Sequence, residues 1–398
     1  FEPVAEGPWD GISMIEPARD VSGNCVIYTG AELAWVANQV NQGHAITGIK
    51  IAKDIDLGNQ PWTPIGYGTY FTGKIDGQGY HIYNMYINKS DLTEKSNFAG
   101  FIGGTNSESC DIININLSGK IDIPASVAQK TQVGSFVGKA NALGNMINCH
   151  SDVEINIMGA PAYVGGVLAF MKNANIKNCS YSGNITIATS GKVTNGIGGI
   201  LGCTNSSTTG IEAVINGCYF DGSIKNNGSE IPKYVAGINS YSNLSKAAET
   251  ITNNYVIGTI DCTATDQGSV YGKTNTTNFD CENNYYYADY TLTGKGGIPM
   301  KIEEFHSGEV AYLLNGDQME FLFGQELDSD DNMPVVYRGS NRVYKTIFMY
   351  NDNEYAVLYN NTEMKFPKNP VPDDSPTFEG WYDEKGNRYD GNSTTQTD

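Results

Sequence analysis

The chain has 398 residues, with 25 Lys or Arg against 44 Asp or Glu, so its formal net charge at pH 7 is −19. A field of this sign repels phosphate backbones and anionic lipid headgroups, which argues against nucleic acid or a membrane surface as the partner. The sequence has no run of about 20 apolar residues, the length that spans a bilayer, so no membrane insertion is predicted.

The remaining composition is typical of a secreted bacterial β-protein. Only 17% of the residues are charged, and the chain holds 46 Gly and 25 Tyr. The first residue is Phe1 and not Met, and the last eight residues form a polar tail. These ends predict a mature or engineered fragment of a longer chain, monomeric as a fragment.

The first predicted element is a helix that caps the chain's N-terminal side. Thr29 and Glu32 have the spacing of a capping box, and apolar residues at helical intervals follow as far as Val40, before Gly43 ends the helix. A strand is expected next, from Ile49 to Leu57, because apolar residues alternate there.

A short Gly-rich phrase then recurs six times, in the form apolar-(Gly/Ala)-(Gly/Ser)-apolar. Its second position falls at residues 99, 134, 165, 198, 236 and 268. A second phrase, apolar-x-x-site, follows each copy, with site positions at Ile115, Cys149, Cys179, Cys218, Asn254 and Asn284, and an earlier copy centres on Met85. Self-similarity at this period indicates units that bury their apolar faces only by stacking on their neighbours.

Short apolar runs bounded by Gly and Asn predict strands, and a strand-rich unit of this length fits one coil of a parallel β-helix. We expect about seven coils, in which equivalent residues form ladders. The eight cysteines are then expected to be buried free thiols, because equivalent positions in parallel neighbours rarely have disulfide geometry; disulfides are the alternative.

A second cap is predicted after the coils. Ser307 has the position of a helix N-cap and Gly316 that of a C-cap, and two strand-like pieces follow at 334–337 and 342–344.

The body of the chain resembles GLUG-motif proteins. The resemblance lies in Asp54-Ile55-Asp56-Leu57, Trp62-Thr63-Pro64-Ile65-Gly66, the segment from Phe71 to Ile82 and the repeated Gly-rich phrases, and it covers roughly residues 25–345. It implies a secreted or wall-attached bacterial protein with a β-helical body.

The C-terminal segment resembles a different family, the Listeria–Bacteroides repeats of Gram-positive surface proteins. The matching residues are 346–350, the turn at Asp352-Asn353, and Pro376 to Tyr382 with Lys385-Gly386-Asn387. Such a repeat implies a small β-grasp-like module that acts as a spacer.

The predicted fold class is therefore mainly β: a right-handed parallel β-helix with helical caps and a small C-terminal module. The expected domains are an N-terminal segment and capping helix (1–60), the β-helix (61–290), a C-terminal cap (291–345) and the Listeria–Bacteroides-like module (346–398).

The sequence offers no catalytic constellation. Its four histidines, at positions 44, 81, 150 and 306, lack partners at metal-ligand spacing and are expected to be structural. Asp152 and Asp221 fall at one equivalent position two coils apart, near the separation of an inverting glycosidase pair, but such a coincidence is expected by chance in an acidic chain. No cofactor is predicted. Calcium at Asp328 and Asp330 is the one metal alternative, against a solvated loop, because no Gly follows where a calcium loop turns.

One outward ladder is a candidate for ligand binding. The residue after each site position points away from the core, which places Tyr219, Tyr255 and Tyr285 on three successive coils. Such an exposed strip could stack sugar rings or a protein partner, or it could simply stabilise the sheet face.

The interpretation of function is a cell-surface or secreted adhesin-like protein that is not an enzyme and binds a glycan or an extracellular host protein. Two alternatives stay open. One is a polysaccharide lyase or glycoside hydrolase with its site in an outward groove. The other is a non-catalytic region of a larger surface protease, since GLUG phrases also accompany such enzymes.

Overall fold

The computed structural model describes residues 7–92, 97–128, 130–190, 194–289, 294–316, 322–327, 333–336, 343, 345–347, 354, 357 and 359. The chain divides into two compact units, Phe1–Pro299 and Met300–Asp398. The first unit is a parallel β-solenoid of about six turns, which confirms the predicted fold class; seven coils had been expected.

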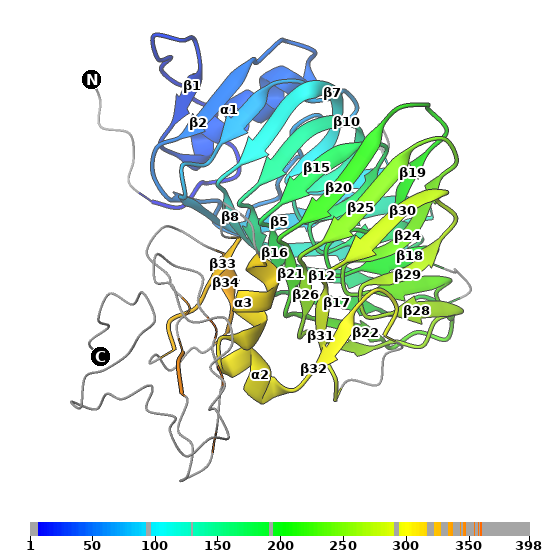
Figure 1. Ribbon diagram of the computed structural model, residues 1–398. Helices are drawn as coiled ribbons and strands as arrows, with labels where there is room; N and C mark the ends of the chain where they lie inside the picture. Colours follow the sequence, from blue (N-terminus) through cyan, green and yellow to red (C-terminus); the bar gives the residue numbers. More distant parts are fainter. Residues whose placement is uncertain are drawn as a thin grey trace, which may run out of the picture. The chain divides into compact units, whose positions relative to one another are not determined.

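Three parallel sheets run along the solenoid, and Figure 1 shows their strands stacked from the N-terminal coils to the C-terminal ones. Sheet A contains β1 (Cys25–Ile27), β2 (Gly48–Ile51), β4 (Lys74–Asp76), β7 (Ile102–Ile113), β10 (Val137–Ile147), β14 (Leu168–Met171), β15 (Ala174–Lys177), β19 (Thr204–Ser206), β20 (Glu212–Asn216), β24 (Asn239–Leu244), β25 (Ala248–Thr252), β29 (Tyr271–Thr274) and β30 (Asn278–Glu282).

Sheet B contains β3 (Ile55–Asp56), β5 (His81–Asn88), β8 (Asn116–Ile123), β11 (His150–Ser151), β12 (Glu154–Ile157), β16 (Ser180–Tyr181), β17 (Asn184–Ile187), β21 (Tyr219–Phe220), β22 (Ser223–Asn226), β26 (Tyr255–Val256), β27 (Thr259–Asp261), β31 (Tyr285–Tyr287) and β32 (Ile298–Met300). Sheet C contains β6 (Phe98–Ala99), β9 (Thr131–Gly134), β13 (Pro161–Gly165), β18 (Gly196–Gly198), β23 (Tyr234–Ala236) and β28 (Asp266–Gly268). A single 3-10 turn, η1 (Lys89–Asp91), follows β5.

Each Gly-rich phrase forms the corner at which the chain passes from sheet C to sheet A. A Cβ at Gly134, Gly165 or Gly198 would collide with the carbonyl oxygen of the residue three positions later, because the chain folds back on itself there. Such a corner favours glycine, with Ala99 and Ala236 as the exceptions, which explains why the phrase repeats a small residue at this position. Even the divergent copies at Val235 and Gln267 pair in register with their neighbours.

The site positions form an inner ladder, as predicted, from Ile115 to Asn284. Cys149 Sγ contacts Ile112 O at 3.4 Å, and Asn254 Nδ2 donates to Ile215 O at 3.1 Å. Thiol and amide side chains at the ladder position thus make the same contact, with a backbone carbonyl of the preceding coil. All eight cysteines are free, which confirms the preferred thiol prediction, and all of them except the half-buried Cys281 are buried. Burial raises the pKa of the Cys110 thiol to about 12, so it stays protonated and unreactive at neutral pH.

A ladder of asparagines that the sequence analysis missed turns each coil from sheet A to sheet B. The residue before each inner-ladder position has a positive φ, between 49° and 66°, and it is Asn114, Asn148, Asn178, Gly217, Asn253 and Asn283 in turn. Asn and Gly are the residues that adopt this conformation most readily. Asn148 Nδ2 also donates to Asn114 Oδ1 at 3.0 Å, so the turns support one another.

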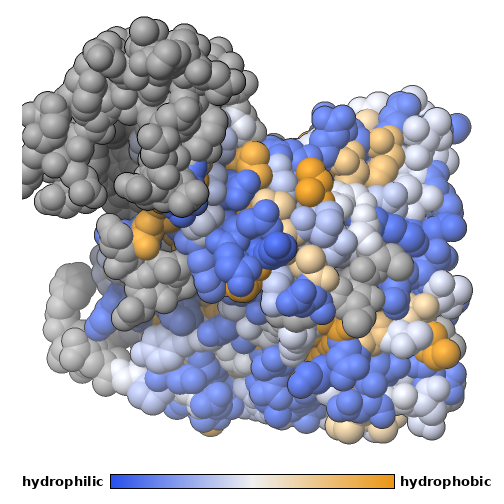
Figure 2. All heavy atoms as spheres, turned by 60° about the horizontal axis from the view of Figure 1, so that its bottom comes forward, coloured by the Kyte–Doolittle hydropathy of each residue, from blue (hydrophilic) through white to orange (hydrophobic). Residues whose placement is uncertain are grey.

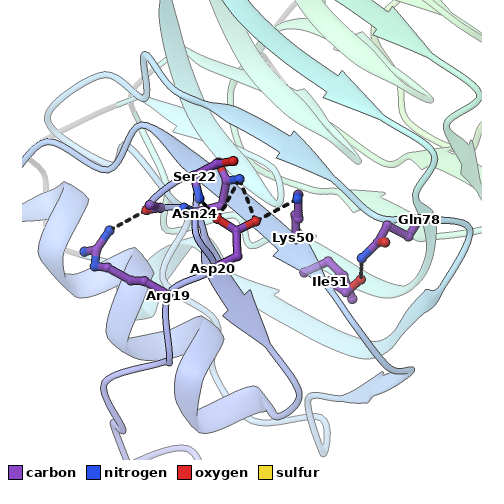
Figure 3. Close-up of polar contacts among 8 residues, drawn as sticks. Arg19, Asp20, Ser22, Asn24, Lys50, Ile51 and Gln78 are labelled. Carbon is purple, nitrogen blue, oxygen red and sulfur yellow. Dashed lines mark hydrogen bonds and ion pairs between the residues drawn. The ribbon is translucent and has the colours of Figure 1, made fainter.

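The solenoid's N-terminal edge is covered by α1 (Gly30–Asn41), whose capping box joins Thr29 and Glu32 as predicted. Beside it, the carboxylate of Asp20 accepts hydrogen bonds from Asn24 and from Lys50 Nζ at 2.7 Å (Figure 3). These bonds hold the pKa of Asp20 well below its usual range. Short β1, flanked by such polar contacts, is a poor template for further strands.

Several predicted details are wrong. The strand expected from Ile49 to Leu57 is two strands in different sheets, β2 and β3, because a turn separates them. Met85 is not on the inner ladder: it pairs with Gly119. In the first Gly-rich copy Ala99, and not Phe98, pairs with Val133, whereas Ile102 pairs with its equivalent Val137, so the shift of one residue is confined to β6.

The described part of the second unit contains α2 (Ile302–His306), α3 (Glu309–Asn315) and an antiparallel pair of strands, β33 (Phe323–Gly324) and β34 (Val335–Val336). The N-cap of α3 is Gly308 and not Ser307, although Ser307 Oγ accepts from Glu309 N at 3.3 Å. Gly316 is the C-cap, as predicted. Most of the segment predicted to resemble a Listeria–Bacteroides repeat lies outside the described residues.

Towards the C-terminal coils the interior becomes polar. Glu249, on β25, is fully buried; its Oε1 accepts from Thr204 Oγ1 at 2.6 Å and from Asn239 Nδ2 at 2.9 Å. Burial raises the pKa of this carboxyl from 4.5 to about 7, against the opposing effect of its hydrogen bonds.

We predict that Asn148→Ala lowers the free energy of unfolding by about 2 kcal/mol, because alanine is less stable than asparagine in the left-handed backbone conformation and cannot form the hydrogen bond to Asn114. Asn148→Gly, which keeps the backbone conformation that Gly217 adopts naturally, should cost about 1 kcal/mol. Chemical denaturation measures both; equal losses for the two variants would contradict a conformational role for this residue.

Glu249 should make stability fall as pH rises. Its pKa is higher in the folded than in the unfolded chain, so the folded protein binds more protons between pH 4.5 and about 7. The stabilisation is complete below pH 4.5 and decreases by about 3 kcal/mol once the group ionises. In Glu249→Gln this component should vanish, whereas exposed Glu212→Gln should keep it; urea unfolding at pH 4.5 and pH 8 compares them. A wild-type pH dependence in Glu249→Gln would refute this.

Candidate ligand-binding surface

The predicted tyrosine ladder forms in register. Tyr219 pairs with Tyr255 and Tyr255 with Tyr285 on β21, β26 and β31. The rings of Tyr219 and Tyr255 stack in parallel, with their centroids 4.9 Å apart. Exposure differs from the expectation: Tyr219 is half-buried, but Tyr255 and Tyr285 are only 1% and 5% exposed. The open strip is thus reduced to Tyr219, and ligand binding by the three residues stays a prediction.

A more open aromatic surface lies at the corner between sheets C and A. Outward side chains seven residues apart, one on each side of the corner, meet there. Tyr163 and Phe170 have ring centroids 6.1 Å apart, and Tyr234 and Tyr241 stack at 4.5 Å. Outward side chains of two consecutive strands can meet only where the surface bends inward, so this corner is re-entrant.

The corner pairs of successive coils join into one line. We call this line the aromatic row and define it by Phe98, Lys139, Tyr163, Phe170, Tyr234 and Tyr241. Strand pairing sets the order, since Lys139 lies beside Phe170 and residue 196 lies between Tyr163 and Tyr234. Phe98 is buried and the others are half-buried, so part of each of those other side chains is open to solvent.

Small residues make room for the row. Outward Gly104 lies under Tyr70, whose ring a Cβ at position 104 would touch at 2.9 Å. At Gly196 a Cβ would meet Ser240 Oγ and would approach the Tyr163 ring at 3.3 Å. Larger residues at these two positions would push the aromatic rings out of line.

Lys139 is the one cation in the row. Its Nζ lies 5.2 Å from the ring centroid of Phe98 and 5.8 Å from that of Phe170, which are cation–π distances. Desolvation lowers the pKa of Lys139, and the positive charge of Lys172 lowers it further. Within the described residues neither lysine forms an ion pair.

Amide side chains border the row on sheet A. Asn243 Nδ2 donates to Asn205 Oδ1 at 3.3 Å, and Asn275 Nδ2 donates to the Tyr241 hydroxyl at 3.1 Å. The surface thus combines the aromatic rings of the row, the positive charge of Lys139, which has no ion-pair partner among the described residues, and a line of side-chain amides. It can stack a ring, pair with an anion and hydrogen-bond hydroxyls.

The sequence carried a signal for this surface. The residues that face each other stand seven positions apart in each repeat, as in Tyr163 and Phe170 or Tyr234 and Tyr241. Only the structure shows that the corner between them bends inward, and therefore that the spacing brings the side chains together.

The other candidates from the sequence do not assemble into a catalytic site. Ser182 lies in the coil between Asp152 and Asp221, because β16 pairs with both β11 and β21. His81 and His150 bond the hydroxyls of Ser118 and Ser180, at 2.9 and 2.8 Å.

Neither a metal site nor a membrane span is found in the part of the chain that the structure describes. No three His, Cys, Asp or Glu side chains gather there in a way that could hold a metal ion, and Asp328 and Asp330 fall outside that part. The helices within it are too short or too polar to cross a membrane.

The face drawn in Figure 2 is mainly hydrophilic, with separate small hydrophobic patches. One surface groove of about 380 Å³ lies on sheet B; it is lined by Asn88, Lys120, Asp122, Pro124, Asn156, Ile157, Met158, Thr186 and Ala188. Lys120 and Asp122 pair there at 3.5 Å, so their charges compensate each other and the groove has no free charge comparable to Lys139.

Comparison with known proteins gives two similarities. An immunoglobulin A1 protease of Streptococcus sanguinis is 25% identical over 234 residues, which are 57% of this chain and 11% of that protein. A crystal structure of an immunoglobulin A1 protease-like protein from Bacteroides ovatus superimposes with a TM-score of 0.55 at 18% identity, over 81% of this chain and 95% of that one.

These similarities support a β-helical, surface-type protein, and the structural one shows the fold alone. The chain spans 11% of the length of the curated relative. No family model matches the chain, so the GLUG and Listeria–Bacteroides resemblances stay predictions.

The pairing of rings across the corner can be measured by a double-mutant cycle. We predict a coupling energy of about 1 kcal/mol between Tyr234→Ala and Tyr241→Ala in chemical denaturation, the usual value for a stacked pair. Phe98→Ala and Tyr241→Ala, which alter distant parts of the row, should be additive. Additivity of Tyr234→Ala and Tyr241→Ala would mean that the two rings do not interact in solution.

Proposed function

We propose that this chain is a non-catalytic, β-helical binding region of a larger secreted or wall-attached bacterial protein related to immunoglobulin A1 proteases. One observation carries the proposal: the 234 matched residues make up only 11% of a protein named for that protease activity. The β-helix shared with the Bacteroides ovatus protein supports it.

In this role the solenoid holds a macromolecular partner, and the protease activity belongs to other parts of such proteins. The aromatic row is the surface best suited to the task, because aromatic side chains bury large areas at little cost in conformational entropy. The rigid stack of coils keeps the row preformed, which lowers the cost of binding.

An adhesin is the second candidate function, and the same row favours it. The two roles differ in the partner: an immunoglobulin for the protease region, and a surface ligand for the adhesin.

The proposal predicts that residues 1–398 bind immunoglobulin A1 saturably without cleaving it. Surface plasmon resonance measures the binding, with immunoglobulin G as the control, and gel electrophoresis after incubation shows whether cleavage occurs. Tyr241→Ala should weaken binding about tenfold, a loss of about 1.4 kcal/mol.

Tyr80→Ala is the matched control, because Tyr80 is 38% exposed and lies outside the row. Its affinity should equal that of the unaltered chain. Equal binding of both immunoglobulins, no binding, or cleavage by the isolated chain would each reject the protease-region role.

A further inference from the structure

We propose that the aromatic row binds an acidic oligosaccharide, whose sugar rings stack on the aromatic side chains and whose carboxylates pair with Lys139 and Lys172. The inference rests on the proposed function in one respect only, that the row is the chain's binding surface.

In this proposal the aromatic side chains of the row contact the sugar rings. The apolar faces of pyranose rings pack on flat aromatic faces, and here the rings of Tyr163 and Phe170, and then of Tyr234 and Tyr241, follow one another along the solenoid. From β6 to β23 the row crosses four strand spacings, about 19 Å. A surface of this length suits an oligomer and exceeds the size of a single ring.

In this proposal the two lysines pair with the carboxylates of the sugar. Lys172 lies beside β10, next to Lys139, because its backbone N–H donates to Ala140 O at 3.0 Å. In a chain with a net charge of −19, neither lysine has an ion-pair partner among the described residues. Lys139 is also half-buried between two aromatic rings, so its charge is poorly hydrated. A carboxylate placed over the two lysines would supply the missing counter-charge.

In this proposal the side-chain amides beside the row form hydrogen bonds with the hydroxyl groups of the sugar. Asn205, Asn243 and Asn275 lie in register on β19, β24 and just after β29, beside the aromatic rings. At the far end Asp266 is neutralised by Lys273 at 3.8 Å and Lys295 at 3.4 Å, so it does not repel an anion.

An acidic peptide is the competing ligand, and the geometry favours it less. Extended peptides commonly bind by adding a strand to a free sheet edge. The row lies on the faces of strands such as β13 and β14, which are already paired on both sides. Its backbone groups are therefore not available for such pairing, whereas stacking on side chains needs none.

The experiment uses residues 1–398 and isothermal titration calorimetry with four probes: a galacturonic acid hexamer, a sialylated oligosaccharide, a neutral glucose hexamer and a glutamic acid hexapeptide. We expect one of the two acidic sugars to bind at least tenfold more tightly than the neutral sugar and the peptide. Its affinity should fall with added salt.

Lys139→Met keeps the packing of the side chain and removes its charge, and it should weaken binding of the acidic sugar about tenfold. Lys225→Met is the matched control, because Lys225 is exposed on β22, in sheet B, away from the row, and its affinity should not change. Thermal unfolding of both variants verifies that they fold.

The inference is overturned if neither acidic sugar binds, if the neutral sugar or the peptide binds as tightly, or if Lys139→Met and Lys225→Met behave alike. Sugar binding without immunoglobulin A1 binding would reject the protease-region role and keep the inference. Immunoglobulin binding without sugar binding would do the reverse.

Discussion

The structure depends on one constraint: each coil must lie on the next with its strands paired in parallel, so that most residues of the strands lie beside their equivalents in the next coil. The constraint acts on the backbone first. At the corners, a Cβ at Gly165 would collide with a carbonyl of its own chain, and at the opposite turn Asn148 adopts a left-handed conformation. These local requirements fix where each coil bends, and the parallel hydrogen bonds between coils then align the side chains into ladders.

The aromatic row follows from that alignment. A pair such as Tyr163 and Phe170 would be an isolated surface contact in an ordinary loop. Because each coil repeats the same inward bend, the pairs of several coils line up, and Lys139 is held between the rings of two different coils. A solenoid thus obtains an extended aromatic surface from a spacing of seven residues within one repeat.

Much of the fold could be predicted from the sequence, because its signals are local. The Gly-rich phrase, the inner ladder from Ile115 and the capping box at Thr29 each depend on a few neighbouring residues. The register of β6 could not be predicted, since it is shifted by one residue against β9 although the rest of the phrase pairs with its equivalents. The site was predictable only in part: the stacking of Tyr219 on Tyr255 follows from the repeat, but their exposure depends on side chains that no repeat specifies.

The inner ladder has a consequence for how the solenoid comes apart. Near its N-terminal side the ladder is apolar, at Ile115. Near its C-terminal side it consists of Asn254 and Asn284, and Asn254 Nδ2 donates a hydrogen bond to Asn284 Oδ1 at 2.9 Å. Apolar burial is non-directional and is lost only in part when a neighbouring coil leaves, whereas a hydrogen bond between two side-chain amides exists only while both partners are in place. Loss of the last coil would remove the bond from Asn254 to Asn284 and leave Asn254 its bond to Ile215 O. Fraying is therefore expected to start there and to pass inward one coil at a time, and backbone amides on that side should exchange their hydrogens with solvent first.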